Sequence, residues 1–189
     1  MSDFPIHSLD TAPEAATPLL EKSQAAFGRI PSLHGTLAEA PGVLEGYQVL
    51  HKLFLATSFK NDEKTVVWQT INVEHECHYC VPGHTAIANA MKVDPAITEA
   101  LRNETPLPTE RLEALRTFTL AVLRGRGHVS EDELNAFYAA GYTKAQVLEV
   151  ILGLSQKVIS NYVNHIADTP IDAPVQKFAW TRAPKTAAE

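Results

Sequence analysis

Residues 74–84 read EHECHYCVPGH, and this stretch contains the only two cysteines of the chain, Cys77 and Cys80. His84 follows four residues after the second cysteine. If the segment is helical, spacings of three and four residues place both sulfurs and the imidazole on one face. Pro82 favours a helix that begins near Cys80, because proline fits only the first turn of a helix, where its missing N–H is not needed. The stretch therefore predicts a helix start that carries two thiols and one imidazole.

This arrangement favours redox chemistry. A thiol at a helix N-terminus meets the positive end of the helix dipole, and a neighbouring imidazole can take its proton. Both effects lower the pKa of a cysteine from about 8.5 toward neutrality. Two cysteines at this spacing can also close a disulfide after one of them is oxidised, as a peroxide-reducing or disulfide-exchanging site requires.

Two alternatives use the same residues. A buried cysteine is often a small apolar core residue, and Ile87 and Met91 continue the same helical face. A zinc site would instead take four nitrogen and sulfur ligands from Cys77, Cys80, His84 and either His75 or His78. Structural zinc sites usually draw ligands from two separated segments, and the sequence contains no second cluster of Cys and His. The redox interpretation is therefore favoured over both alternatives.

The composition is that of an ordinary, mildly acidic protein. The chain has 189 residues and a net charge of −6, and 45% of its residues are hydrophobic and 20% charged. Nucleic acid is therefore not expected as a partner, since phosphate binding needs clustered positive charge. The start MSDFPIHSLD lacks the features of a signal peptide, and no apolar run approaches the roughly 18 residues of a membrane span. We expect a cytoplasmic protein without membrane contact.

The rest of the sequence predicts an all-α fold of a single domain with two helical halves. We expect an N-terminal arm at 1–16 and a helical domain at 17–189, with halves at 17–104 and 109–167 and a tail at 168–189. Helix starts are predicted at Thr17, Ser32, Asn61, Asp94, Ser130 and Thr143. One apolar face, expected in the core, is formed by Val43, Tyr47, Leu50 and Phe54. A second apolar stripe is formed by Val147, Ile151, Leu154, Val158 and Tyr162.

With these residues in view, the chain resembles the alkylhydroperoxidase D-like, or carboxymuconolactone decarboxylase, superfamily, and in particular its peroxidase-related branch. The resemblance depends chiefly on Glu74-x-Glu76-Cys77-His78-Tyr79-Cys80-Val81-x-x-His84-Thr85. Further matches are Phe27-Gly28-Arg29-Ile30-Pro31, Ala40-Pro41, Ala140-Gly141-Tyr142, Leu148-Glu149 and Asn161-Tyr162-Val163-Asn164. They extend over nearly the whole chain after about residue 20.

The resemblance implies a helical homo-oligomer that reduces organic hydroperoxides with a thiol or dithiol reductant, without metal or other cofactor. Cys80 would attack the peroxide, Cys77 would resolve the sulfenic acid, and His84 would accept the proton of Cys80. Members that decarboxylate a muconolactone lack the cysteine pair, so that activity is not expected. The alternatives are a disulfide reductase of the same fold, or a redox-sensing or metal-binding oligomer that does not turn over.

One position departs from the resemblance. The family's proton relay often includes a glutamate twelve residues before the first cysteine, and Thr65 occupies that place. Glu63 and Glu74 are the nearby candidates to replace it, although Glu63 is turned by about 200° from the expected position on a helix. His51 is a further relay candidate, because its helix resembles the family's substrate-side helix. Glu149 is interpreted as either a proton carrier or an interface ion-pair partner, while His34, His128 and His165 are expected to be structural.

Overall fold

The computed structural model describes residues 3–183, and these form helices joined by loops, without a β-strand. The elements are η1 (Glu14–Ala16), α1 (Thr17–Phe27), α2 (Ser32–Leu37), α3 (Pro41–Leu55), α4 (Asn61–Glu74), α5 (Cys80–Ala90), α6 (Pro95–Arg102), α7 (Glu110–Arg124), α8 (Glu131–Ala139), α9 (Lys144–Ala167) and η2 (Ala173–Phe178). The all-α prediction is confirmed. None of the described helices has the length and hydropathy that crossing a membrane requires.

Capping residues set several of the helix starts. The side chains of Asp94, Ser130 and Thr143 accept backbone N–H groups at the starts of α6, α8 and α9. Glu133 and Gln146 complete capping boxes in α8 and α9, as their spacing from Ser130 and Thr143 predicts. These three starts are confirmed.

Three other predicted caps are wrong by one residue. Each is the first residue of its helix, and the capping position is the residue before it: Thr17, Ser32 and Asn61. Two of them are bonded elsewhere. The Ser32 hydroxyl donates to Asp172 at 2.7 Å, and the Asn61 amide donates to the carbonyl of Met91 at 3.2 Å. A side chain held by a distant segment is not available to cap its own helix.

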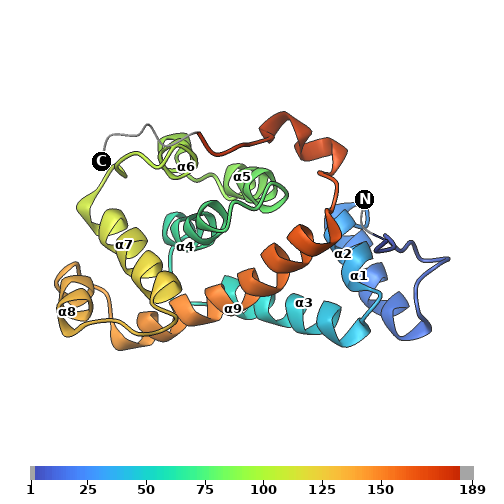
Figure 1. Cartoon of the computed structure of the whole chain (residues 1–189), viewed down its shortest axis with the longest axis horizontal. Helices are drawn as coiled ribbons and strands as arrows, with labels where there is room; N and C mark the ends of the chain where they lie inside the picture. Colours follow the sequence, from blue (N-terminus) through green and yellow to red (C-terminus); the bar gives the residue numbers. More distant parts are fainter. Residues whose placement is uncertain (1–2, 184–189) are drawn as a thin grey trace.

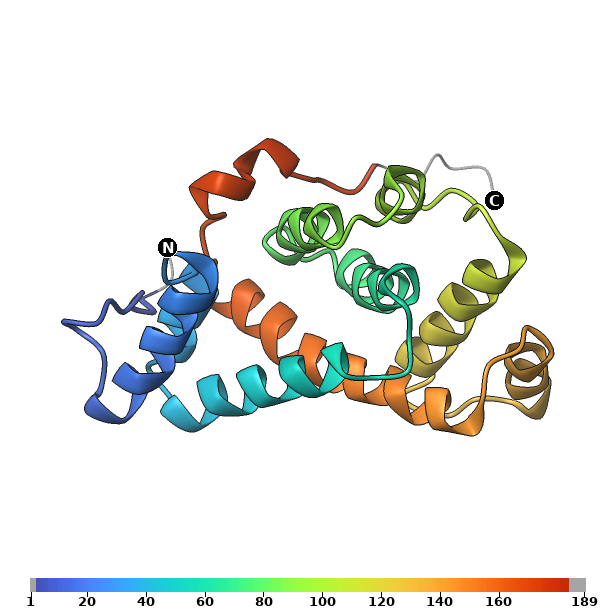
Figure 2. The ribbon, with the colours of Figure 1, turned by 180° about the vertical axis from the view of Figure 1, so that it is seen from behind.

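Helix α9 runs along the molecule from the end where α8 lies to the end where α1 and α2 lie, with α3 beside it (Figure 1). Helix α4 lies inside, packed against α5, α6, α7 and α9, and Figure 2 shows it enclosed from the opposite side. Every residue of α4 from Glu63 to Val73 is buried. The central helix therefore has no solvent-facing side over this length.

Two apolar clusters make up the core. The larger joins residues of both predicted halves, including Phe54, Trp68, Leu115 and Val150. The smaller gathers side chains of α1, α2 and α3 around Tyr79 and the two cysteines. Because α4 packs against α7 and α9, the segments 17–104 and 109–167 share one core.

The ends of the chain pack against α2, α5 and α6. In the arm, the His7 N–H donates to the carbonyl of Gly35 at 3.1 Å, and a Cβ at Gly35 would lie 2.8 Å from the His7 carbonyl oxygen. After α9, the C-terminal segment crosses α5 as η2, and the Trp180 indole donates to the carbonyl of Arg102. Residues 1–2 of the predicted arm and 184–189 of the predicted tail lie outside the described residues.

The predicted apolar faces are only partly buried. In α3, Tyr47 and Phe54 are buried, but Val43 is 40% exposed because the adjacent Leu44 takes its place in the core. In α9, Ile151 and Tyr162 of the predicted stripe are 43% and 51% exposed. The buried side of α9 is instead largely polar: Gln156, Lys157, Ser160, Asn161 and Asn164.

Gly153 provides a test of how closely α9 packs. A Cβ at this position would lie 2.7 Å from Cε2 of Phe54 and 3.0 Å from Cγ1 of Val67. Alanine improves helix propensity by roughly 1 kcal/mol, but overpacking a core costs roughly 1–3 kcal/mol. We expect Gly153→Ala to lower the midpoint of thermal and urea unfolding.

The matched control is Gly46→Ala in α3, where a Cβ would meet no atom within 4 Å. This variant should gain stability through helix propensity alone. Gly153→Ala unfolding at or above the wild-type midpoint would contradict the close contact.

Candidate active site

The two cysteines lie where α4 turns into α5. Helix α4 ends at Glu74, the chain turns through Glu76 at φ 54°, and α5 begins at Cys80 with Pro82 in its first turn. The predicted helix start at Cys80 is confirmed. Cys77 precedes the helix, and its Sγ accepts the Cys80 N–H at 3.3 Å. Both thiols are free and buried.

The two thiols differ in ionisation. Burial alone would raise the pKa of Cys80, but the hydrogen bond from Cys77, the charge of Lys157 and hydrogen bonds from Ser160 and Asn164 outweigh it. Together they hold the pKa of Cys80 well below 9. The Asn164 amide donates to Cys80 Sγ at 3.2 Å. The pKa of Cys77 is raised by its hydrogen bond to Cys80 and by burial. Cys80 is therefore the more acidic of the two thiols.

Lys157 is the cation of this site. Its side chain is fully buried, and Nζ lies 2.9 Å from Nε2 of His84. Burial, the charge of Lys157 and His51 hold the pKa of His84 well below 6.5, so the imidazole is neutral. Its Nε2 therefore accepts from the ammonium, and the ring proton is on Nδ1, which is buried without a hydrogen-bond partner. Among residues 3–183, no carboxylate lies within ion-pair distance of Lys157.

The structure thus brings together Cys77, Cys80 and His84. Of the four relay candidates, Glu63, Glu74 and Thr65 are not bonded to this group. Glu63 accepts two hydrogen bonds from Arg111, at 3.1 and 3.0 Å, and Glu74 accepts two from Arg124, at 2.7 and 2.8 Å. Thr65 is buried in α4. None of these three residues hydrogen-bonds to His84, whose Nε2 is taken by Lys157 and whose Nδ1 has no partner.

His51 is the relay candidate that the site includes. The Gln156 amide donates to its Nδ1 at 3.1 Å, and its ring stacks on Trp68, which in turn packs against His84 with ring centroids 4.8 Å apart. Burial and the charge of Lys157 lower the pKa of His51 to about 4. His51 is therefore neutral near pH 7.

The remaining candidates are engaged elsewhere. His75 donates to Asn161 at 2.9 Å and His78 donates to the carbonyl of Thr169 at 3.1 Å. The four ligands of the zinc alternative therefore do not converge, and the described residues contain no group of three or more His, Cys, Asp or Glu side chains suited to a metal ion. Glu149 accepts from the backbone and hydroxyl of Ser58, at 2.9 and 2.6 Å, and so anchors the loop before α4.

The polar face of α9 is the part of the site that the sequence analysis missed. The Asn161 amide donates to Asn72, and the Asn72 amide donates to Gln69 at 2.9 Å. Gln69 donates in turn to the carbonyl of Val81 in the first turn of α5. The signal in the sequence is a second helical stripe on α9, formed by Lys157, Ser160, Asn161 and Asn164.

A cavity of about 290 Å³ gives access to the reactive groups. Cys80, His84 and Lys157 line it, together with mostly apolar and aromatic side chains from α1, α2, α3 and α5. Tyr79 and Asp172 form part of the wall, joined by a 2.5 Å hydrogen bond from the phenol to the carboxylate.

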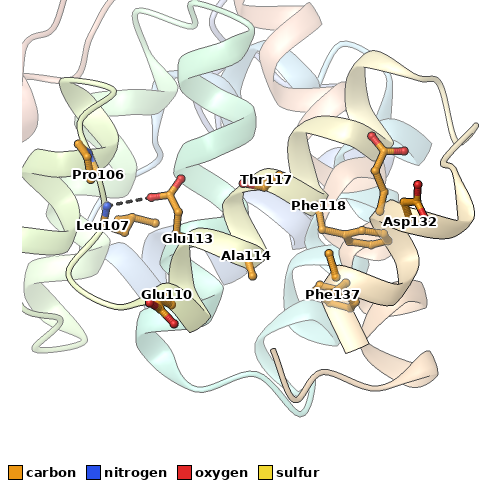
Figure 3. Close-up of a pocket in the computed structure, with 11 residues that line it drawn as sticks. Pro106, Leu107, Glu110, Glu113, Ala114, Thr117, Phe118, Asp132 and Phe137 are labelled. Atoms are coloured by element: carbon orange, nitrogen blue, oxygen red, sulfur yellow. Dashed lines mark hydrogen bonds between the residues drawn. The ribbon is translucent and has the colours of Figure 1, made fainter. Parts of the chain in front are cut away.

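Two further cavities differ in their relation to the thiols. One of about 550 Å³ shares Phe27, His34, Tyr47 and Ile87 with the thiol cavity, and so adjoins it. Another, of about 650 Å³, lies between α7 and α8 (Figure 3). Its lining combines apolar side chains such as Phe118 and Phe137 with carboxylates, and includes no cysteine, histidine or lysine. The reactive groups therefore belong to the smaller cavity.

Solved structures similar to this one identify the fold. An uncharacterized peroxidase-related protein from Ralstonia eutropha JMP134, described as an alkylhydroperoxidase AhpD core, superposes with a TM-score of 0.82 at 20% identity, over 97% of this chain and 98% of its own. The chain has the alkylhydroperoxidase D fold. This fold is the one that the sequence resemblance implies.

Two other solved structures match over most of their length. A peroxidase-related protein from Silicibacter sp. TM1040 has a TM-score of 0.76 at 16% identity, over 92% of each chain. A variant of the debrominase Bmp8 in complex with 2,3,4-tribromopyrrole has a TM-score of 0.77 at 17% identity, over 94% of this chain and 95% of its own. No protein-family model and no curated protein matches the sequence.

The difference between the two thiols is directly testable. In Cys77→Ser, the hydroxyl still donates to Cys80, so the thiolate should persist to a pH well below the pKa of about 8.5 of a free cysteine. As the pH falls through the lowered pKa, Cys80 gains a proton and its thiolate absorbance is lost. The matched variant Cys80→Ser should titrate above that value, because Cys77 is buried. Equal midpoints for the two variants would contradict the assignment.

Proposed function

We propose that this chain is a thiol-dependent peroxidase that reduces organic hydroperoxides. The observation that carries the proposal is the pairing of two free, buried thiols, with the Cys80 N–H 3.3 Å from Cys77 Sγ and Cys80 lining a mostly apolar cavity. Such a pair can attack an electrophilic oxygen with one sulfur and resolve the product with the other. The two peroxidase-related proteins of the same fold agree with this chemistry.

The reaction has two steps. The thiolate of Cys80 attacks the terminal oxygen of the hydroperoxide, the O–O bond breaks, and Cys80 becomes a sulfenic acid while an alkoxide leaves and is protonated to the alcohol. Cys77 then attacks the sulfenic sulfur, which closes the disulfide and releases water. A thiol or dithiol reductant restores the pair.

The implied role of His84 as proton acceptor of Cys80 stays a prediction. The Nε2 atom is occupied by Lys157, at 2.9 Å, and Cys80 is ionised in the reduced protein. A direct transfer from Cys80 to His84 is therefore not needed before attack. In this proposal, neutral His84 accepts the hydrogen bond from Lys157.

A second candidate is reductive dehalogenation, favoured by the aromatic, apolar cavity and by the debrominase that shares the fold. The thiolate would attack a halogen of an aromatic substrate and form a sulfenyl halide, while the resulting carbanion takes up a proton. Cys77 would then displace the halide and give the same disulfide. A disulfide reductase, or a redox sensor without turnover, would use the same pair.

The test is intact-mass analysis before and after one equivalent of cumene hydroperoxide. Formation of the Cys77–Cys80 disulfide should lower the mass by about 2 Da. Cys77→Ser should react once and stop at a sulfenic acid that dimedone traps, whereas Cys80→Ser should not react. If Cys80→Ser keeps the single turnover and Cys77→Ser loses it, the two roles are exchanged.

Steady-state consumption separates the alternatives. A peroxidase consumes the hydroperoxide continuously when dithiothreitol is present, while a sensor is oxidised once. Turnover with a brominated pyrrole but not with hydroperoxides would favour dehalogenation. Wild type that forms no disulfide with either substrate would refute both catalytic proposals.

We also propose that the protein is a homo-oligomer. The outer sides of α3 and α9 expose large apolar residues, namely Val49, Leu53, Leu148, Ile151, Tyr162 and Ile166. Exposed apolar side chains gathered on two neighbouring helices are typical of subunit interfaces. Light scattering at micromolar concentration should give a multiple of 20.7 kDa, and Leu53→Glu should shift the distribution toward the monomer. A wild-type monomer would refute this.

A further inference from the structure

Reduction of a hydroperoxide needs a proton as well as a nucleophile. When the O–O bond breaks, the departing alkoxide is a strong base, and the lining of the cavity around Cys80 is mostly apolar. A positioned acid typically accelerates such a step by roughly 10²–10⁴-fold. The question is which group of the site supplies this proton.

Several neighbours are unsuited. The proton of Cys77 is needed in the second step, where it leaves with the sulfenic hydroxyl as water. The phenols of Tyr47 and Tyr79 are weak donors, because burial raises the pKa of each. Neutral His84 holds only its Nδ1 proton, and a neutral imidazole is a very weak acid.

We propose that Lys157 is the catalytic acid of this site: its buried ammonium gives a proton to the alkoxide that leaves when Cys80 attacks, and His84 positions it. The inference rests on the proposed function. Lys157, Cys80 and His84 line the same cavity, Lys157 Nζ lies 2.9 Å from His84 Nε2, and its charge acts on the Cys80 thiol.

The surroundings of Lys157 favour this role. An ammonium has three N–H donors, and its hydrogen bond to His84 occupies one of them. Since no carboxylate among residues 3–183 pairs with it, its charge is balanced by the thiolate of Cys80, whose pKa it helps to lower.

The protons and electrons balance over the cycle. Thiolate, ammonium and hydroperoxide give sulfenic acid, neutral amine and alcohol. Cys77 then forms the disulfide and its proton leaves in water. A dithiol reductant supplies two electrons and two protons, which restore both sulfurs as thiols, and Cys80 passes its proton back to the amine of Lys157. Each turnover thus resets the ion pair of Cys80 and Lys157.

The experiment compares substrates whose leaving groups differ in basicity. Peracetic acid releases acetate, a weak base that needs no acid, whereas tert-butyl hydroperoxide releases a strongly basic alkoxide. Rates of sulfenic acid formation are measured in the Cys77→Ser background, at a pH where Cys80 is fully ionised in each variant. Lys157→Met should slow sulfenic acid formation with tert-butyl hydroperoxide by roughly 10²–10⁴-fold. With peracetic acid, the rate should fall by less than tenfold.

The ratio of the two rates separates acid catalysis from other roles. If Lys157 only lowers the pKa of Cys80, neither reaction slows at full ionisation, and if it only supports the fold, both slow equally; either result overturns the inference. Alkylation of Cys80 by iodoacetamide, which needs no acid, should stay within a few-fold of wild type at full ionisation. Lys157→Arg keeps the charge but donates a proton poorly, so it should show the same selective loss as Lys157→Met.

Wild type provides a measurement that does not depend on a variant folding. Across a series of hydroperoxides and peracids, assistance by an acid predicts a weak dependence of the rate on leaving-group basicity. A steep dependence would overturn the inference while leaving the peroxidase proposal intact. Absence of reaction with every peroxide would refute the proposed function itself.

Discussion

The burial of one ammonium group sets much of the electrostatics around the two thiols. Lys157 is fully enclosed, and its neighbours are the neutral imidazole of His84 and the thiol of Cys80 rather than a carboxylate. A buried charge without a partner is costly, so the thiolate of Cys80 and the ammonium of Lys157 depend on each other. Burial, followed by the same charge, lowers the pKa of His84 and of His51 and keeps both imidazoles neutral.

This constraint explains why α9 is polar on its inner side and apolar on its outer side. Gln156, Ser160 and Asn164 face α4 and the cysteines. Gln156 hydrogen-bonds to the Trp68 indole, and Ser160 and Asn164 hydrogen-bond to the Cys80 thiol. These bonds replace the hydration that the indole and the thiol lose on burial. The apolar residues of the helix, such as Leu148 and Ile166, are left on the surface. Because the inner face of α9 contacts the site, only its outer face is available for association between subunits.

Local signals in the sequence predict the helices and the start of the site well. Pro82 fixes where α5 begins, the capping boxes at Ser130 and Thr143 fix α8 and α9, and Cys80 and His84 are four residues apart. Each of these features depends on residues within one or two turns. The fold class follows from them together with the resemblance.

What the sequence does not predict depends on contacts between distant segments. Lys157 is 73 residues from His84, and Asp172 is 93 residues from Tyr79. The same reason explains why Ser32, which is held by Asp172, does not cap α2. It also explains why the pairing of Glu63 with Arg111 could not be predicted. No spacing rule connects such pairs, so a single sequence points to nearby carboxylates and not to the lysine that contacts His84.

The order of the elements along the chain has a consequence for biosynthesis. The ribosome delivers Cys77 and Cys80 with α5, long before Lys157 and Asn164 of α9 and the segment that carries Asp172. Until α9 has been made, the Cys80 thiol lacks the hydrogen bond from Asn164 and the charge of Lys157. The nascent chain therefore acquires the groups that lower the pKa of Cys80 only after its cysteines have been in place for more than sixty residues of synthesis.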